Sequence, residues 1–386
     1  MGSQIFARYC VPTMRALLLV LDSVGCGAAP DAASYGDVGS HTLGHIYERT
    51  PGFSLPTLEG LGLAAILGRP GTPRASWGKM RERSAGKDTT TGHWEIAGAE
   101  LEVPFVTYER FPDSVVRAIE AEAGVEFIGN FPRSGTVVLE ELGAEHVRTG
   151  KPILYTSADS VMQIAAHEGV FPLARLYALC EIARRHCDPL RVGRVIARPF
   201  VGEPGAFKRT GGRHDYAMLP PRTVLAALAE EGHAVHGVGK ISDIFAGCGI
   251  TTSTPTASNA EGMAAIERLW PTHSGLMFAN LVDFDMLFGH RRDVAGYARC
   301  LAEFDAWLAT FVFNADDLII ITADHGNDPT HPGTDHTREE VPLLVMHGGT
   351  AVPLGTRESF ADVAATLADF FRLKTWPRER SFWNDE

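Results

Sequence analysis

The sequence predicts an α/β protein whose core is a doubly wound sheet carrying an inserted, smaller α+β domain. Apolar runs that read as buried strands alternate with stretches whose apolar residues recur at helical spacing. The chain has 386 residues, which is roughly two and a half ordinary domains and suits one core with an insertion. This alternation changes only in the middle of the chain, where we place the insertion.

Four apolar runs are predicted to be buried strands, and three of them end in an acid. The runs and the polar residues that follow them are 15–21 with Asp22, 276–282 with Asp283 and Asp285, 318–322 with Asp324 and His325, and 341–346 with His347. Unbroken apolar character is typical of parallel strands that are covered on both faces. Ligands of open α/β sheets bind beyond the carboxyl ends of the strands, so these acids are candidate functional residues.

Helical patterns and a change of pattern set the domain organisation. Apolar residues recur every three or four positions in 222–231, 294–311 and 360–371. The middle of the chain instead shows helical stretches at 114–123 and 173–186, short β-like pieces, and a tail rich in Gly, Pro and Arg at 198–214. We therefore predict a core at 1–106 and 221–386, an inserted cap domain at 107–220, and an extension outside the fold at 1–13.

Composition and charge exclude several classes of protein. Hydrophobic residues make up 45% and charged residues 21%, as in ordinary globular proteins. Because 35 basic residues face 47 acidic ones and no long basic run occurs, neither nucleic acid nor an anionic membrane is an expected partner. No apolar run is long enough for a transmembrane helix or a secretory signal, so we expect a cytoplasmic protein. The 6 cysteines lack metal-binding spacing and are expected to be reduced.

The strand ends and the segments after them hold a set of oxygen and imidazole donors. The candidate metal ligands are Asp22, Asp285, His290, Asp324, His325 and His336. A lone residue of this kind is more often structural, but an acid that closes an apolar strand is costly to bury unless it is paired or bound to metal. Donor sets without thiolate suit divalent ions such as Mn²⁺ or Zn²⁺, and this set is large enough for two ions.

The segment GKDTTTGHWE at 86–95 places hydroxyl groups beside an acid. Asp and Thr are favoured at the start of a helix, and this structural interpretation competes evenly with a functional one. A hydroxyl needs a metal or a base to become a nucleophile. Two adjacent cations would activate it and would also hold the attacking and leaving oxygens of a phosphoryl group.

Several segments together carry a family resemblance. They are LDSVGCGAAPDA, GSHTLGHI, GKDTTTGHWEIAG, YTSADSVMQIAAHE, IARPFVGEPG with RHDYA, GVGKISDIF, VDFDMLFGHRRD and TADHGNDPTHPGTDHTREEVPLLV. With them the chain resembles the phosphopentomutases of prokaryotic type, in the alkaline phosphatase superfamily, from about residue 15 to 373. ADHG alone is shared across that superfamily, whereas GKDTxTGHWE and VDFDxLxGHRRD with the inserted domain are more specific. The resemblance implies an alkaline-phosphatase-like core with a cap.

The resemblance also implies an activity. Such an enzyme interconverts ribose 1-phosphate and ribose 5-phosphate, and the 2-deoxyribose equivalents. A phosphorylated threonine donates its phosphoryl group to the sugar monophosphate, and the 1,5-bisphosphate intermediate turns around and returns its other phosphate. Two Mn²⁺ ions are implied as cofactors, and glucose 1,6-bisphosphate or a pentose 1,5-bisphosphate is implied as the activator.

Residue roles follow from the same resemblance. One ion is assigned to Asp285, His290 and His336, and the other to Asp22, Asp324, His325 and the nucleophile. The nucleophile is Thr89, because it follows the acid of the GKDT motif. The run of three threonines allows a shift of register, so Thr91 is the alternative.

A mutase must exclude water, because its phosphothreonine would otherwise be hydrolysed. We expect the inserted domain to close over the substrate as a lid. The predicted substrate contacts are Ser157, Asp159, Val161, Arg198 and Arg209 in the insertion and Lys240 in the core. Guanidinium groups suit the distal phosphate. In the competing interpretation the two arginines lie solvated in a Gly- and Pro-rich loop, Asp159 caps a helix, and His93 and Trp94 serve packing.

Two other functions compete with the mutase. A metal-dependent phosphatase or phosphodiesterase on the same core would release phosphate without a bisphosphate primer. A binding protein without activity is less favoured, because every expected metal ligand is present. We expect a monomer, because no segment resembles a dedicated interface.

Overall fold

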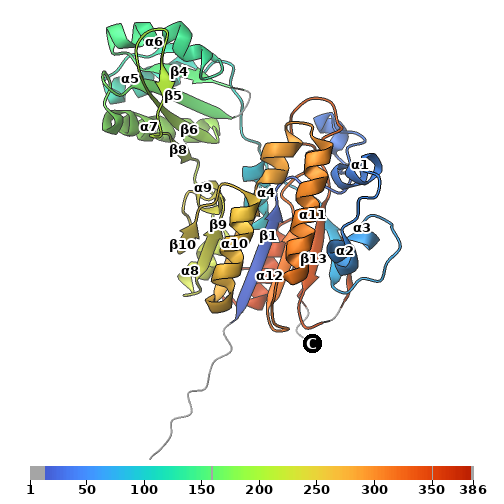
Figure 1. Cartoon of the computed structure of the whole chain (residues 1–386). Helices are drawn as coiled ribbons and strands as arrows, with labels where there is room; N and C mark the ends of the chain where they lie inside the picture. The colour runs from blue at the N-terminus through green and yellow to red at the C-terminus, as the bar shows by residue number, and fades with distance from the viewer. Residues whose placement is uncertain (1–13, 158–159, 350, 384–386) are drawn as a thin grey trace, which may run out of the picture. The chain divides into compact units, whose positions relative to one another are not determined.

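The computed structural model describes residues 14–157, 160–349 and 351–383 (Figure 1). Contacts between residues divide the chain into two compact units. The first unit runs up to Glu102 and resumes at Pro220, and the second unit is Val103–Leu219. The sequence places the insertion at 107–220.

An eight-stranded sheet forms the centre of the first unit, in the order β10-β9-β11-β1-β12-β13-β2-β14. The strands, in the order of the sheet, are β10 (Thr252–Thr254), β9 (Val235–Val238), β11 (Gly275–Leu281), β1 (Arg15–Leu21), β12 (Leu318–Thr322), β13 (Val341–Met346), β2 (Ser76–Met80) and β14 (Pro353–Arg357). The five strands from β10 to β12 run parallel. β13 is antiparallel to both of its neighbours, and β14 is parallel to β2.

The central strands position the site. β11 and β12 are buried along their whole length, and β1 from its second residue on. Each fully buried Leu or Ile contributes about 1.5–3 kcal/mol relative to an exposed one. Val20 of β1 is level with Asn280 of β11 and with Thr322 of β12. The acids that follow these three strands therefore leave the sheet at one edge, as the sequence predicts.

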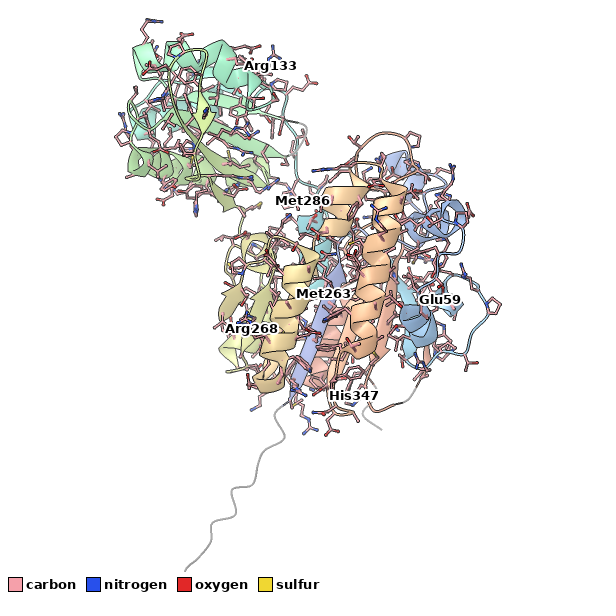
Figure 2. The ribbon with its side chains drawn as sticks, in the orientation of Figure 1. Glu59, Arg133, Met263, Arg268, Met286 and His347 are labelled. Atoms are coloured by element: carbon pink, nitrogen blue, oxygen red, sulfur yellow. The ribbon has the colours of Figure 1, made fainter. Side chains whose placement is uncertain are left out.

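The direction of β13 differs from the prediction of four parallel strands. Its Val345 pairs with Ile320 of β12 in antiparallel register. A parallel connection needs a crossover segment, usually a helix, and the fully described connection 323–340 contains none. His347 therefore leaves the sheet at the edge opposite to the acids. Figure 2 shows His347 and Met286, the neighbour of Asp285, at opposite ends of this unit.

Helices pack on both faces of the sheet, as the doubly wound prediction requires. They are α1 (Thr42–Arg49), α2 (Pro56–Leu58), α3 (Ala64–Ile66), α4 (Thr89–Ile96), α8 (Val224–Glu230), α9 (Ile241–Ile244), α10 (Asn259–Leu269), α11 (Val294–Thr310) and α12 (Asp362–Phe370). One layer joins α11 to α1 and α2, and another joins α12 to α4 and α8. Figure 1 shows α10 and α11 in front of β1. None of the helices in the described part of the chain is long and apolar enough to cross a bilayer.

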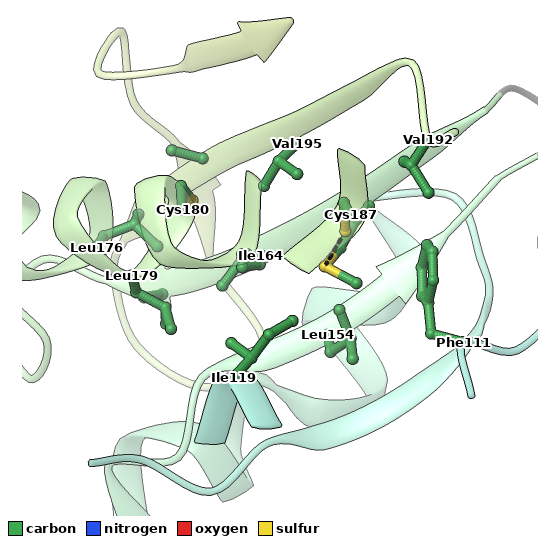
Figure 3. Close-up of a cluster of buried hydrophobic side chains, with 14 of the residues drawn as sticks. Phe111, Ile119, Leu154, Ile164, Leu176, Leu179, Cys180, Cys187, Val192 and Val195 are labelled. Atoms are coloured by element: carbon green, nitrogen blue, oxygen red, sulfur yellow. Dashed lines mark hydrogen bonds between the residues drawn. The ribbon is translucent and has the colours of Figure 1, made fainter. Parts of the chain in front are cut away.

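The second unit has a six-stranded sheet and, among its described residues, three α-helices. Its strands are β3 (Ile128–Pro132), β4 (Ile153–Thr156), β5 (Val161–His167), β6 (Arg194–Val201), β7 (Lys208–Arg209) and β8 (His214–Ala217), and its helices are α5 (Asp113–Ala123), α6 (Val137–Thr149) and α7 (Leu173–Cys187). A buried cluster joins α5 and α7 to the sheet, and in it Cys187 Sγ lies 3.6 Å from Met162 Sδ (Figure 3). The interpretation of 198–214 as a loop is wrong at its start. Arg198 lies inside β6, which pairs with β5, β7 and β8.

Candidate metal centre

Asp22, Asp324 and His325 meet at the carboxyl edge of the central strands. His325 Nε2 lies 3.4 Å from Asp22 Oδ1 and 3.3 Å from Asp324 Oδ2. Their exposed fractions are 3%, 0% and 1%, respectively. Directly after β1 the chain turns sharply, with a φ of 70° at Ser23, whose backbone N–H donates to Asp324 Oδ1 at 3.1 Å. The turn therefore fixes the two acids relative to each other.

A second donor group consists of Asp285, His290 and His336. Asp285 lies in the short π-helix η5 (Phe284–Gly289), which directly follows the strand end. His290 Nε2 lies 3.1 Å from Asp285 Oδ2 and 3.2 Å from His336 Nε2, and His336 Nε2 lies 3.4 Å from Asp285 Oδ1. His290 Nδ1 lies 2.7 Å from the carbonyl oxygen of Thr334, so Nδ1 carries the proton and Nε2 faces the acid.

The two groups adjoin each other. The rings of His325 and His336 lie 4.0 Å apart between their centroids. Two sets have ligand atoms within 4.8 Å of one another, namely Asp22 with Asp324 and His325, and Asp285 with His325 and His336. His325 belongs to both sets geometrically, although the resemblance assigns it to the ion of Asp22 and Asp324. All six predicted metal ligands thus come together in the first unit.

The donor chemistry fits divalent cations. Asp22 Oδ1 and Asp324 Oδ2 are buried and accept no hydrogen bond from any residue that the structure describes. Such an oxygen is costly to bury unless something compensates its charge. Carboxylates and imidazoles without thiolate are donors that suit Mn²⁺ and Zn²⁺. The residues present can therefore hold the ions that the sequence implies.

Ionisation in the site reflects an excess of buried negative charge. Burial and the charge of Asp324 raise the pKa of the Asp22 carboxyl. Burial alone would raise the pKa of Asp285 as well, but hydrogen bonds from two histidines outweigh it and hold that pKa below its ordinary value. Burial alone would lower the pKa of His325, but Asp324 and Asp22 raise it well above its ordinary value. Positive charge is thus strongly favoured here.

Thr89 is the first residue of α4, and its hydroxyl reaches the first donor group. Its Oγ1 lies 3.2 Å from His325 Nε2. Asp88 caps the helix, because its carboxylate accepts hydrogen bonds from the backbone N–H groups of Thr90 and Thr91 at 3.0 and 3.1 Å. The Thr91 hydroxyl is buried and donates to the same carboxylate at 2.5 Å. The segment is therefore a helix cap and also presents Thr89, rather than Thr91, to the donor group.

The rest of the GKDTTTGHWE segment fixes α4 in place. A Cβ on Gly92 would overlap the backbone oxygen of Asp324, so the helix approaches the acid closely only because this residue is glycine. Trp94 is buried and donates from Nε1 to the carbonyl of Ile244 at 3.0 Å, which agrees with the packing interpretation. Glu95 is fully buried and accepts backbone N–H bonds from the preceding loop and from Phe360.

Two residues of the TREE sequence hold the loops around the site, and the sequence alone did not single them out. The buried carboxylate of Glu339 accepts hydrogen bonds from the backbone N–H groups of Gly27 and Thr42 at 3.1 and 2.9 Å. The buried guanidinium of Arg338 pairs with Glu82 at 2.6 Å and donates to the carbonyl of Gly86. These bonds tie the segment after His336 to the loops that follow β1 and precede Thr89.

The predicted cap contacts lie in the second unit. Arg198 Nε donates to Gln163 Oε1 at 3.0 Å, and Gln163 Nε2 donates to Ser157 Oγ at 3.4 Å. Val161 is buried at the start of β5, and Arg209 is exposed in β7. Burial and the nearby guanidinium groups of two other arginines, one of them that of Arg209, lower the pKa of Arg198. Arg198 and Ser157 are thus brought together through Gln163.

Two further predicted contacts are Asp159 and Lys240. Asp159 lies outside the described residues. Lys240 belongs to the first unit, is exposed, and follows β9, whose end is level with Ala279 of β11. It therefore leaves the sheet at the same edge as the acids. Sequence reasoning also missed Asn327, which donates to Asp285 Oδ1 at 2.7 Å and stands in the same segment as His325.

Comparison with known proteins defines the class of this fold and site. A family model described as the Metalloenzyme superfamily matches residues 14–375. A solved structure of a protein from Pyrococcus horikoshii aligns with a TM-score of 0.50 and 14% identity, over 97% of this chain and 99% of that one. At that identity the likeness shows the fold alone. The chain is thus an α/β enzyme of the metalloenzyme class.

Curated relatives narrow the class to one family. The phosphopentomutase of Syntrophotalea carbinolica is 55% identical over 93% of this chain and 95% of its own length. The phosphopentomutase of Carboxydothermus hydrogenoformans is 53% identical over 96% of this chain and 99% of its own length. The chain belongs to the phosphopentomutase family of the metalloenzyme superfamily. It is a metal-dependent phosphomutase, as the resemblance implies.

The close contact at Gly92 gives a test of the site geometry. Gly92→Ala adds a Cβ against the backbone of Asp324, so α4 must move away from the metal-binding edge. We expect phosphomutase turnover to fall by about a hundredfold, because displacement by about 1 Å can cost that much. Turnover and Mn²⁺ affinity are measured together. Gly71→Ala is the control, since its nearest neighbour would be Ala64 Cβ at 3.2 Å in a segment distant in sequence from the site. Equal activity of both variants would contradict the prediction.

Proposed function

We propose that this protein interconverts ribose 1-phosphate and ribose 5-phosphate, and the 2-deoxyribose phosphates, through a phosphothreonine at Thr89 and a 1,5-bisphosphate intermediate. The observation that carries the proposal is the position of the Thr89 hydroxyl. It lies 3.2 Å from His325 Nε2, next to two buried carboxylate oxygens that accept no hydrogen bond from described residues. Relatives with more than half of their residues identical bear the name phosphopentomutase.

Two Mn²⁺ ions are the proposed cofactors. Asp22, Asp324 and His325, with the Thr89 hydroxyl, would hold one ion, and the second group of Asp285, His290 and His336 would hold the other. When bound, the ions lower the pKa of the hydroxyl and neutralise charge on the phosphoryl group. The buried oxygens of the first group that lack a hydrogen-bond partner among the described residues, and the partly exposed histidines of the second group, support this division.

The residues around Thr89 hold its hydroxyl in place and provide a favourable electrostatic field for the phosphoryl group. Thr89 stands at the N-terminus of α4, where the helix dipole favours the negative charge of a phosphoryl group. Phosphoryl transfer has a loose transition state, so alignment of the reacting atoms and charge neutralisation provide most of the catalysis. The bonds of Asp88 to the first turn and of Glu95 to the preceding loop hold Thr89 in one position.

The second unit would supply the distal phosphate contacts. We assign Arg198 and Arg209 to the phosphate that is not transferred, and Ser157, Asp159, Val161 and Lys240 to the sugar phosphate as a whole. The hydrogen bond from Arg198 to Gln163 supports this assignment, because it directs the guanidinium while leaving other N–H groups for an anion. The predicted cytoplasmic location and monomeric state stay predictions.

Phosphorus NMR of the two ribose phosphates tests the function. With Mn²⁺ and a catalytic amount of glucose 1,6-bisphosphate, we expect interconversion with little inorganic phosphate, and we expect chelation of the metal to stop it. Turnover without the bisphosphate should decline as the phosphothreonine is lost. Inorganic phosphate that accumulates without isomerisation would show a phosphatase instead.

Replacement of the nucleophile gives a sharper test. Thr89→Ala should reduce isomerisation by at least about a thousandfold, because the acceptor of the phosphoryl group is removed. Mn²⁺ should still bind through the remaining carboxylates and imidazoles. Thr90→Ala is the control, and its activity should stay within about twofold of the wild type, because the substitution keeps the backbone N–H that contributes to the helix cap. Full activity of Thr89→Ala together with an inactive Thr91→Val would move the nucleophile to Thr91.

Arg198→Ala tests the phosphate contact. Loss of a charge-assisted hydrogen bond should raise KM about 10- to 100-fold and increase the share of substrate that is hydrolysed. Steady-state kinetics with separate detection of isomer and inorganic phosphate provide both values. Arg110→Ala is the control, because it removes an exposed arginine of the same unit whose Nη2 lies 2.9 Å from Asp113 Oδ1, and it should change neither value. An unchanged KM in Arg198→Ala would contradict the assignment.

A further inference from the structure

We propose that Asn280 and His93 are positioning residues for the metal centre. Asn280 holds Asp22 in the orientation that leaves Asp22 Oδ1 available to a divalent cation, and the ring of His93 lies against Asp324 Oδ2 and fixes the Asp324 carboxylate beside it. This inference rests on the proposed function in one respect, because it takes Asp22 and Asp324 as ligands of one ion. Neither Asn280 nor His93 is among the residues that the sequence indicates as ligands.

Asn280 is a polar residue in an otherwise apolar, buried strand. It lies in β11 and is 1% exposed. Its Nδ2 lies 3.1 Å from Asp22 Oδ2 and 3.2 Å from His93 Nε2. An amide nitrogen has two N–H donors, whereas a carboxylate can only accept, so this nitrogen serves both neighbours. The opposite amide orientation would place an oxygen against the Asp22 carboxylate.

This orientation of the Asn280 amide leaves its oxygen without a hydrogen bond from any residue that the structure describes. Asn280 Oδ1 is buried and has no hydrogen-bond partner among the described residues. An unsatisfied buried acceptor destabilises a fold, so the two bonds on the nitrogen side must outweigh it. A residue that served only packing in β11 would be apolar like its neighbours. The polar side chain is explained by what it does to Asp22.

The proton position on His93 follows from Asn280. Because His93 Nε2 receives an N–H from Asn280, Nε2 carries the lone pair and Nδ1 carries the proton. Nδ1 then donates to the carbonyl of Thr89 at 2.8 Å and lies 3.0 Å from Asp324 Oδ2. The ring is fully buried and stacks on Phe278 with 5.8 Å between centroids, which prevents it from turning.

Together these contacts form one continuous network. It runs from Asp22 through Asn280 and His93 to the backbone of Thr89, with Asp324 beside the ring of His93. Groups that orient metal ligands from behind typically change metal affinity 10- to 100-fold when they are removed. The network therefore fixes the positions of Asp22, Asp324 and Thr89 around the proposed site of one metal ion.

The test is Mn²⁺ binding by the purified full-length chain, measured without substrate. Free Mn²⁺ gives a six-line EPR signal that is lost on binding, and calorimetry gives the same affinities independently. The variants are Asn280→Leu and His93→Gln. The control is His146→Gln in the second unit. His146 is fully buried, its Nδ1 lies 2.7 Å from the carbonyl oxygen of Lys151, and its Nε2 accepts from the His167 backbone N–H at 2.8 Å. It matches the hydrogen bonding of His93 without a metal ligand beside it.

We expect the wild type to bind two Mn²⁺ ions. In Asn280→Leu and His93→Gln the affinity for one of them should fall 10- to 100-fold, while His146→Gln keeps both. His93→Asn places its amide near the former Nδ1 and should retain more affinity than His93→Gln, which a general loss of packing would not produce. Asn280→Asp, which keeps the shape but loses the donor, should weaken binding if Asn280→Leu fails to fold.

The outcomes separate this inference from the proposed function. Wild-type affinity in folded Asn280→Leu and His93→Gln would overturn the positioning role while leaving the metal centre intact. An equal loss in His146→Gln would show general destabilisation and would overturn the role as well. Wild-type protein that binds no Mn²⁺ would overturn the proposed Mn²⁺ centre itself. Thermal unfolding of the metal-free variants shows which of them are folded.

Discussion

The burial of uncompensated negative charge at one edge of a sheet is the constraint on which the rest of the structure depends. Asp22, Asp285 and Asp324 are all buried, and the most exposed of them, Asp285, is 7% exposed. Taking such charges out of water is expensive unless donors or cations surround them. The neighbouring groups meet this requirement in part, because histidines and backbone N–H groups point at the acids. The remaining negative charge favours a cation at this edge of the sheet.

A site of this kind works only if the loops that carry it cannot relax toward water. Here buried hydrogen bonds, rather than apolar contacts, hold the loops in place. Glu339 and Arg338 each bridge separate loops, and both are almost completely buried. Because hydrogen bonds to charged groups are stronger and more directional than apolar contacts, they fix positions as well as energies. These bonds therefore keep the acids at the carboxyl edge of the central strands in fixed positions, which a metal centre requires.

The sequence predicted the elements of this site better than their arrangement. The strands of Asp22 and Asp324 and all six predicted ligands could be found, because an acid that closes an apolar run is an improbable residue without a function. The direction of β13 could not, since periodicity identifies a strand but not its partner. Arg198 was placed at the start of a tail rich in Gly, Pro and Arg, because that composition is typical of loops, whereas it lies inside β6. Asn280 carried a usable signal, a buried amide in an apolar strand, whose purpose only the three-dimensional contacts reveal.

The two units carry electrostatic imbalances of opposite sign. In the first, the carboxylates of Asp324 and Asp22 raise the pKa of His325, and in the second, burial and clustered guanidinium groups lower the pKa of Arg198. Tyr155 near this cluster has a buried hydroxyl that has no hydrogen-bond partner among the described residues. A cation would compensate the first imbalance and an anion would compensate the second.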